Sequence, residues 1–307
     1  MPHEIVILGV FVADAAFRAA RMPVVGETLI GTGFTLGPGG KGSNQAVAAA
    51  KAGGDVGFIA RLGQDPFAEM AKKVWADSGV TPLIIRDTEN GTGAAGIFIE
   101  EESGKNAIVI APGAAGAISI ADVDTQADAI RAARVAVTQL EQSVDVAAHF
   151  LRLAHQAGTT TILNPAPAAP LTDEILTFCD YITPNETEAE ALTGIPVNTP
   201  QDAETAARAL LNRGVRKAAI ITLGDQGALV HDGATTRRIP PLSAGPVVDT
   251  TGAGDAFNGG LATALAAGQD LDAALRFATA TAALSVTREG TAASMPERAE
   301  IDALLRR

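Results

Sequence analysis

Residues 247–260 read VVDTTGAGDAFNGG: an apolar run that ends at Asp249, a glycine-rich turn and the start of an alanine-rich segment. We interpret this order as a strand, a turn and a helix that begins around Asp255. Gly252 and Gly254 let the backbone turn sharply and leave its N–H groups uncovered. Together with the free donors of the helix N-terminus, these groups form a site for negative charge. Asp255 could then accept a proton from an attacking hydroxyl.

Short apolar runs rich in β-branched residues alternate with alanine-rich helical stretches along the rest of the chain. This alternation is typical of βαβ units, in which a mostly parallel sheet is buried between helices. Right-handed crossovers place those helices on both faces of the sheet. The expected strands are Ile5–Val10, Val56–Ala60, Val135–Leu140, Thr160–Leu163, Tyr181–Thr183 and Ala218–Leu223, and the expected helices are Gly42–Ala52, Pro66–Ser78, Val123–Ala132, Val146–Ala157, Asp202–Arg213 and Asp255–Ala267.

Two stretches interrupt this rhythm and predict a second, smaller sheet. Arg18–Leu36 carries Gly, Thr and Phe in strand-like order, and Gly93–Ile110 contains GAAGIFIE and NAIVIA joined by a turn. Both look antiparallel and hairpin-like. We assign insertions at approximately 13–38 and 93–111 to a β flap that acts as a lid and excludes water from a bound substrate. The alternative is an extension of the main sheet with no gating role.

Composition narrows the class of protein and its partners. The 307 residues are 47% hydrophobic and only 4% aromatic, so aliphatic side chains must fill the core. A net charge of −12 disfavours nucleic acid as a partner, because its backbone needs clustered Lys and Arg. The single Cys179 fits a reducing compartment, and neither a signal peptide nor a membrane span is evident. We therefore expect a soluble cytoplasmic protein.

The segment 249–260 also carries a resemblance to a known family. From Asp255 alone a helix cap is the simpler interpretation. The whole string DTTGAGDAFNGG, however, resembles the C-terminal signature of the ribokinase family, the PfkB-type carbohydrate kinases. Further similar segments follow in the expected order over essentially the full length: GPGGKGSNQAVAAAKAG at 37–53, TQLEQ at 138–142, LNPAPA at 163–168, TPNETEAEALTG at 183–194, ITLGDQGAL at 221–229 and SVTREGT at 285–291.

This resemblance implies a fold, a reaction and an assembly. The fold is a single α/β domain over residues 1–307, with three α/β/α layers, a mostly parallel central sheet and a small β-sheet lid. The reaction is the ATP-dependent phosphorylation of D-ribose to D-ribose 5-phosphate by in-line transfer, with Asp255 as base and the N–H groups of Gly252, Ala253 and Gly254 stabilising charge. Mg²⁺ and K⁺ are the implied cofactors, and a homodimer joined through the lid is the implied assembly.

Sugar-binding residues are expected at the end of the first strand and the start of the first helix. Asp14 ends that strand, where open α/β sheets gather ligands, and its carboxylate can accept two hydrogen bonds from a vicinal diol. The Lys41 side chain could equally be an ordinary surface group. By resemblance, the full set is Val12, Asp14, Gly40, Lys41, Gly42, Ser43, Asn44, Glu141 and Asp255.

Val12 departs from the pattern of the family. Ribokinases typically read Asn-Ala-Asp where this chain reads Val12-Ala13-Asp14. The apolar side chain removes one polar partner of the sugar, and a site that lacks this partner discriminates less against a sugar that lacks the hydroxyl. Ribose stays the leading substrate, and 2-deoxyribose, fructose or a nucleoside stays open.

The resemblance places the nucleotide and the cations in the C-terminal half. Glu188 is expected to position Mg²⁺ largely through water, with a carboxylate that balances the helix dipole as the alternative. The expected nucleotide contacts are Asn185, Thr222, Leu223, Gly224, Asp225, Gln226, Gly227, Gly254 and Thr279. A K⁺ ion, held mostly by backbone carbonyls, is expected at Asp249, Thr251, Ser285, Arg288, Gly290 and Ser294.

Other classes of protein are less well supported. GPGGKG at 37–42 and GTGAAG at 91–96 match a dinucleotide-binding motif, but the first follows a turn-rich stretch and the second opens a strand-like segment. Lys41 is followed by Gly42, so no Walker-type ATP site exists. The four histidines are scattered without zinc-ligand spacing. A binding protein on the same scaffold would have no need of Asp255 as a base.

Overall fold

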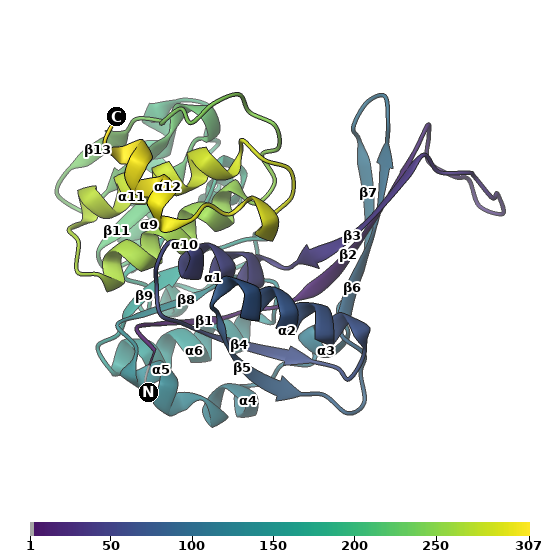
Figure 1. Cartoon of the computed structure of the whole chain (residues 1–307). Helices are drawn as coiled ribbons and strands as arrows, with labels where there is room; N and C mark the ends of the chain where they lie inside the picture. The colour runs from purple at the N-terminus through teal and green to yellow at the C-terminus, as the bar shows by residue number, and fades with distance from the viewer. Residues whose placement is uncertain (1–2) are drawn as a thin grey trace.

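The computed structural model describes residues 3–307, so the first two residues of the predicted domain lie outside it. The chain forms a nine-stranded sheet and a separate four-stranded sheet that projects from the body (Figure 1). The larger sheet has the order β13-β12-β11-β10-β9-β8-β1-β4-β5. Its strands are β1 (Ile5–Leu8), β4 (Val56–Leu62), β5 (Thr81–Arg86), β8 (Val135–Thr138), β9 (Thr160–Leu163), β10 (Tyr181–Ile182), β11 (Ala218–Thr222), β12 (Ala228–His231) and β13 (Thr236–Ile239).

The strands from β5 to β11 all pair in parallel, and the pairs β11–β12 and β12–β13 are antiparallel, so that β12 alone among these strands runs in the opposite direction. This arrangement confirms the mostly parallel sheet. The strand β1, which lies between β8 and β4, reads IVIL and is buried along its whole length. Ile5 and Ile7 belong to one hydrophobic core, and Val6 and Leu8 belong to the other. A continuous apolar run of this kind is what a strand needs when helices cover both of its faces.

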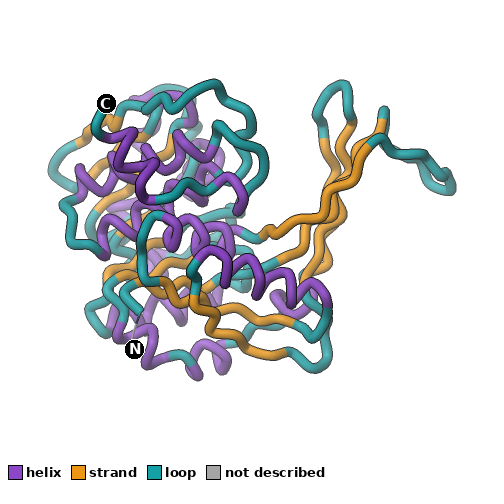
Figure 2. The backbone as a smooth tube through the Cα atoms, viewed as in Figure 1, coloured by secondary structure: helices purple, strands orange, loops and turns teal. Residues whose placement is uncertain are grey.

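Helices cover both faces of this sheet and confirm the three-layer architecture (Figure 2). Each layer buries the apolar side of its helices against one face of the sheet. The first layer contains α1 (Lys41–Lys51), α2 (Pro66–Ser78), α10 (Ala253–Ala266), α11 (Leu271–Ser285) and α12 (Arg298–Leu305). The second contains α4 (Ile120–Thr125), α5 (Ala127–Ala132), α6 (Val144–Gln156), α7 (Asp173–Leu176), α8 (Glu186–Thr193) and α9 (Pro200–Asn212), while the short α3 (Gly113–Gly116) contacts β4.

Two predicted elements differ from the structure. The helix expected at 123–132 is two short helices, because the chain leaves helical geometry at Gln126, which has φ −107° and ψ 10°. The strand expected to end at Asp249 is wrong. Val247 and Val248 are 66% and 56% exposed, and the N–H groups of Val248 and Asp249 bond to the Val286 carbonyl beyond α11 rather than to a strand. The β-branched pair has the composition of a strand, but no strand within residues 3–307 pairs with it.

The smaller sheet has the order β3-β2-β6-β7, and its strands extend away from the body of the molecule (Figure 1). Its strands are β2 (Val12–Ala19), β3 (Gly33–Gly39), β6 (Gly93–Glu100) and β7 (Asn106–Ala111). The pairs β2–β3 and β6–β7 are antiparallel, as predicted, whereas β2 and β6 join them in parallel. Asp14 lies in β2 and therefore belongs to this sheet; its predicted place at the end of the first strand is wrong, because β1 ends at Leu8.

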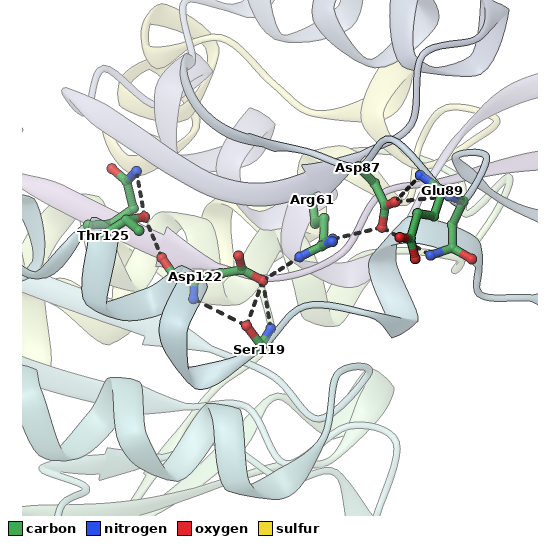
Figure 3. A network of polar contacts seen from close by, with 8 residues as sticks. Arg61, Asp87, Glu89, Ser119, Asp122 and Thr125 are labelled. Carbon is green, nitrogen blue, oxygen red and sulfur yellow. Dashed lines mark hydrogen bonds and ion pairs between the residues drawn. The ribbon is translucent and has the colours of Figure 1, made fainter.

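The root of β6 is held to the body by a polar network around Arg61 of β4 (Figure 3). Arg61 donates from Nε to Asp87 and from Nη1 to Asp122 of α4, each at 2.8 Å. Asp87 is buried after β5 and also accepts two backbone N–H groups of the following loop, at 2.8 and 2.9 Å. These bonds hold the loop 87–92, from which β6 leaves, against β4 and α4 of the body.

Candidate functional site

A cavity of about 150 Å³ lies at the carboxyl edge of the parallel strands, between the starts of α1, α8 and α10. Ligands of open α/β sheets gather at this edge, because loops and helix N-termini converge there. The structure brings part of the predicted site together around this cavity. The predicted residues that line it are Lys41, Asn185, Glu188, Thr222, Gly252, Ala253, Gly254 and Asp255.

The glycine turn before α10 forms one wall of the cavity. Gly252 is the N-cap of α10 and has φ 81°, a left-handed conformation that glycine adopts without strain. The Ala253 N–H donates to the Thr250 carbonyl at 3.2 Å. Within residues 3–307 the N–H groups of Gly252 and Gly254 have no protein acceptor. Two of the three predicted donors are therefore free to bind an anion at the helix N-terminus.

The Asp255 carboxylate lies in the first turn of α10 and is only 6% exposed. Its Oδ2 accepts from the Asn44 amide at 3.1 Å, and its Oδ1 accepts from the Gln45 amide at 3.0 Å. Burial raises the pKa of Asp255, while the nearby Lys41 ammonium and the two amide donors lower it. A buried carboxylate with a raised pKa and bonds that favour its ionised form can act as a general base.

The N-terminus of α1 lies against the end of β1, and this contact brings α1 into the site. A Cβ at Gly42 would lie 2.6 Å from the Cα of Gly9, so the approach depends on glycine. The Lys41 N–H donates to Glu141 Oε2 at 2.7 Å. Burial raises the pKa of Glu141 to about 7, although the Lys41 N–H lowers it. The first turn of α1 thus holds a second carboxylate close to Asp255.

Asp14 and Val12 lie on one side of β2, since side chains two residues apart on a strand share a face. A Cβ at Gly39 of β3 would lie 2.2 Å from Asp14 Oδ2, so glycine leaves the room that this carboxylate occupies. Burial raises the pKa of Asp14 to about 6. Val12 pairs with Gly39 and Gly93, and a Cβ at Gly93 would lie 3.0 Å from a Val12 methyl group. The smaller sheet therefore contributes one carboxylate and one apolar side chain to this region.

Asn185 and Glu188 form a capping box at the start of α8. The Asn185 side chain accepts the Glu188 N–H, and Glu188 Oε2 accepts the Asn185 N–H, each at 2.9 Å. Burial raises the pKa of Glu188. Thr222, at the end of β11, forms a bridge with Asn185, and the 3₁₀ turn at 224–226 follows it. The predicted phosphate and ribose contacts are therefore neighbours along one edge.

The predicted K⁺ residues belong to two adjacent loops joined by Asp249. Its carboxylate accepts the N–H groups of Thr251 at 2.9 Å and Gly290 at 3.1 Å. Burial alone would raise the pKa of Asp249, but these hydrogen bonds lower it. In the described part of the chain, the carbonyls of Asp249, Arg288 and Gly290 accept no backbone hydrogen bond. Carbonyls left free on two loops held together fit a monovalent cation.

Several predicted residues do not reach the cavity with their side chains. The Ser43 hydroxyl is buried and accepts from the Trp75 indole N–H at 2.9 Å. Thr279 is buried inside α11, where its hydroxyl donates to the Leu275 carbonyl at 2.8 Å. Ser285 and Ser294 likewise donate their hydroxyls to nearby carbonyls, and the Arg288 guanidinium pairs with Glu300.

The structure adds polar residues that sequence reasoning did not assign. Asn164, Thr183 and Asn258 line the cavity, and Gln45 contacts Asp255. Asn164 and Thr183 directly follow the ends of β9 and β10. Polar residues immediately after buried parallel strands are a signal that could have found these two. A larger cavity of about 580 Å³ lies between α2 and β5, and none of the predicted site residues lines it.

Comparison with known proteins identifies the class. The family model "pfkB family carbohydrate kinase" matches residues 2–298. The chain is 38% identical over 301 residues to the ribokinase of Haemophilus influenzae, covering 98% of this chain and 97% of that protein. It is 36% identical over 295 residues to the deoxyribokinase of Salmonella typhi, covering 95% of each. The Arabidopsis thaliana ribokinase structure, complexed with ribose and ATP, superposes with a TM-score of 0.93 at 30% identity, covering 100% of both chains.

The fold and these relatives define a carbohydrate kinase, a transferase that phosphorylates sugars. This chain belongs to the pfkB family of carbohydrate kinases, and the resemblance to ribokinases seen in the sequence is confirmed. None of the helices described in residues 3–307 is long and apolar enough to cross a membrane.

Proposed function

We propose that this chain transfers the terminal phosphoryl group of ATP to the exocyclic hydroxyl of a furanose, with D-ribose as the leading substrate. The observation that carries this proposal is the buried Asp255 carboxylate beside two unbonded N–H groups of the glycine turn, all in one cavity. The Haemophilus relative is named ribokinase, and the Arabidopsis structure is described as complexed with ribose and ATP.

The chemistry assigned to these residues follows from their environment. Asp255 accepts the proton of the sugar hydroxyl while the hydroxyl oxygen attacks the terminal phosphorus of ATP. The attack is in line with the oxygen that leaves with ADP. The N–H groups of Gly252 and Gly254, with Ala253 between them, stabilise negative charge on the phosphoryl oxygens. Lys41 lines the same cavity and adds a positive charge there. Asp14, Asn44 and Glu141 supply acceptors and a donor for the other sugar hydroxyls.

The site fits Mg²⁺ held mainly through water and phosphate oxygens. Residues 3–307 contain no group of three acidic, His or Cys side chains that could hold a metal ion by themselves. Glu188 uses Oε2 in the capping box, and its Oε1 accepts no hydrogen bond from the described residues. This free oxygen suits a metal-bound water. When bound, Mg²⁺ would neutralise charge on the phosphates of ATP, while K⁺ between the loops of Asp249 and Gly290 would orient the turn.

Replacement of Asp255 by Asn tests the proposed base. The variant keeps the size of the side chain but removes the proton acceptor, so we expect kcat to fall at least about 100-fold with ATP affinity retained. Asp270→Asn, at the start of α11 and away from the cavity, is the matched control. Measuring ADP release over a panel of sugars gives kcat and identifies the substrate in the same experiment. If Asp255→Asn keeps more than a tenth of the activity, Asp255 is not the base.

We also propose that a second copy of this chain covers one face of the smaller sheet. Phe34, Phe17 and Phe98 are paired across β3, β2 and β6, with ring centroids 4.8 and 5.9 Å apart. They are 58%, 44% and 37% exposed, and a contiguous apolar patch of this kind marks an interface. Phe34→Glu should halve the mass measured by light scattering. Thr35→Glu, on the opposite face of β3, is the control, and an unchanged mass in Phe34→Glu contradicts the lid-mediated dimer.

A further inference from the structure

Gln45 of α1 is the buried contact between the Asp255 carboxylate and the strand ends of the main sheet. Its side chain has no exposed surface. Its Nε2 donates both hydrogens, to Asp255 Oδ1 and to Asn164 Oδ1, each at 3.0 Å. Its Oε1 accepts from Gln139 Nε2 at 2.6 Å. All three polar positions of the amide are therefore bonded, which fixes its orientation completely.

The direction of these hydrogen bonds is dictated by the carboxylate. An ionised carboxylate only accepts, so Gln45 must turn its NH₂ group toward Asp255. Its carbonyl oxygen then faces Gln139, which must donate in turn. The result is a buried chain of donors, Gln139 to Gln45 to Asp255, in which each amide polarises the next. Asn44 supplies the donor to the other carboxylate oxygen.

A second branch from Gln45 leads back to the glycine turn. Asn164, which accepts from Gln45, donates to the Thr183 carbonyl at 3.1 Å. The Thr183 hydroxyl donates to Asn258 at 2.7 Å, and Asn258 donates to the Gly254 carbonyl at 2.8 Å. Gly254 directly precedes Asp255, so the bonds form a closed ring. The carboxylate and the turn that carries the free N–H groups are thus held in one frame.

We propose that Gln45 is a positioning residue for phosphoryl transfer, which holds the rotation of the Asp255 carboxylate and its alignment with the glycine turn. This inference rests on the proposed role of Asp255 as base. The Gln45 bond also lowers the pKa of Asp255 against the effect of burial. The other charged groups near Asp255 are Lys41 of α1, Glu141 before α6 and Glu188 of α8, and the Gln45 side chain bonds to none of these three.

The test replaces Gln45 by Leu and measures both kinetics and the titration of Asp255. Removing a donor to a buried carboxylate should raise the titration midpoint of Asp255 by about one pH unit. It should lower kcat about 10- to 100-fold and change the sugar KM less than about threefold, because the lost contact acts on the reacting group. The midpoint is followed by the ¹³Cγ resonance of labelled aspartate, which is assigned by its loss in Asp255→Asn.

Gln142→Leu is the matched control. Gln142 is also a buried glutamine, and its Nε2 makes two hydrogen bonds, to Thr138 and to the Gln139 carbonyl, without contact to Asp255. We expect this variant to lose stability but to leave the Asp255 midpoint unchanged. If Gln45→Leu does not fold, Gln45→Glu keeps the volume and should raise the midpoint further, because two adjacent carboxyl groups disfavour double ionisation.

The outcomes separate this inference from the proposed function. An unmoved Asp255 midpoint in Gln45→Leu and Gln45→Glu shows that Gln45 only packs the core, and it overturns the inference even if kcat falls. If Asp255→Asn stays active, the assignment of the base fails whatever the Gln45 variants do. If Asp255→Asn is inactive while Gln45→Leu has normal kcat, only the role of Gln45 is wrong.

Discussion

At the scale of single residues, the proposed sugar-binding side of the site depends on residues that leave room for one another. Asp14 can lie in its position because Gly39, on the neighbouring strand, has no Cβ. Val12 occupies the same side of β2 and faces two glycines. The space at Gly39 and the apolar side chain of Val12 each lead to a prediction about sugar binding.

Gly39→Ala should weaken sugar binding without unfolding the protein. The new methyl group would lie 2.2 Å from Asp14 Oδ2, so the carboxylate must move, and a side-chain end moves at little cost to stability. Loss of one bond from a sugar hydroxyl to a carboxylate corresponds to a rise in sugar KM of about 10- to 100-fold. Gly37→Ala is the control on the same strand, because a Cβ there has no neighbour within 4 Å among the described residues. Equal KM values for the two variants would contradict the placement of Asp14 at the sugar.

Val12→Asn should shift the preference between sugars. An apolar side chain cannot bond the hydroxyl that an amide would face, so the native chain should prefer ribose over 2-deoxyribose only narrowly, or prefer the deoxy sugar. The variant should move kcat/KM toward ribose by up to about 10-fold. Val24→Asn, in the exposed loop between β2 and β3, is the control. A strong native preference for ribose that Val12→Asn leaves unchanged would make Val12 a packing residue.

At the scale of elements, the two loops joined by Asp249 connect the proposed K⁺ site to the glycine turn before α10. The turn at 250–252 leads directly into α10, and the second loop follows α11. The Asp249 carboxylate joins them through Thr251 and Gly290. An ion bound between these loops would therefore act on the N–H groups of the turn without touching the reacting atoms.

Activity should rise with K⁺ and much less with Na⁺ at constant ionic strength. Carbonyl oxygens on a preformed loop favour the larger, weakly hydrated ion. Asp249→Asn keeps an acceptor for one N–H group but weakens the tie between the loops, so it should reduce the K⁺ activation. Initial rates in matched KCl and NaCl solutions measure both effects. Equal rates in the two salts would remove the K⁺ site and leave the proposed kinase reaction untouched.

At the scale of the whole molecule, the buried carboxyl groups of the site lower the free energy of unfolding at neutral pH and above. Glu141 has its pKa raised to about 7 from 4.5 by burial, so it binds a proton in the folded chain at pH values where the unfolded chain has released it. Because the folded state then binds more protons, the free energy of unfolding falls as the pH rises from about 4.5 through about 7. Asp14 acts in the same direction, with its pKa raised to about 6.

Glu141→Gln should therefore stabilise the protein above neutral pH. The amide can still accept the Lys41 N–H but needs no ionisation, so the gain in unfolding free energy should be about 2 kcal/mol at about pH 8. This gain should shrink as the pH falls through about 7 and vanish below about pH 4.5, where Glu141 is protonated in both states. Denaturant titrations at several pH values measure it, with Glu102→Gln in an exposed turn as the control. A gain that does not depend on pH would contradict the ionisation argument.

Much of the architecture could be predicted from local patterns. The expected helix Pro66–Ser78 and strand Thr160–Leu163 agree with the structure to the residue, since Asp65 caps that helix and the strand is a short, mostly buried run rich in β-branched residues. The glycine turn before α10 was also predicted. The division of the whole chain into a single domain with a gating lid stays a prediction. The prediction of a strand at Val247–Asp249 was wrong because composition does not reveal whether a partner strand is present.

The sequence by itself determined the alternation of strands and helices, the mostly parallel sheet and the turn that carries Asp255, because all of these depend on patterns within a few residues. Only the tertiary structure decided that β2 and β6 pair in parallel, that Ser43 bonds to Trp75, and that Gln45 contacts Asp255. Gln45 and Asp255 are 210 residues apart in the chain. Contacts of this kind depend on how α1 and α10 cross over the sheet, at Gly259, where a Cβ would lie 2.5 Å from Ala48. No local pattern encodes that crossing, since it results from the close packing of the whole core.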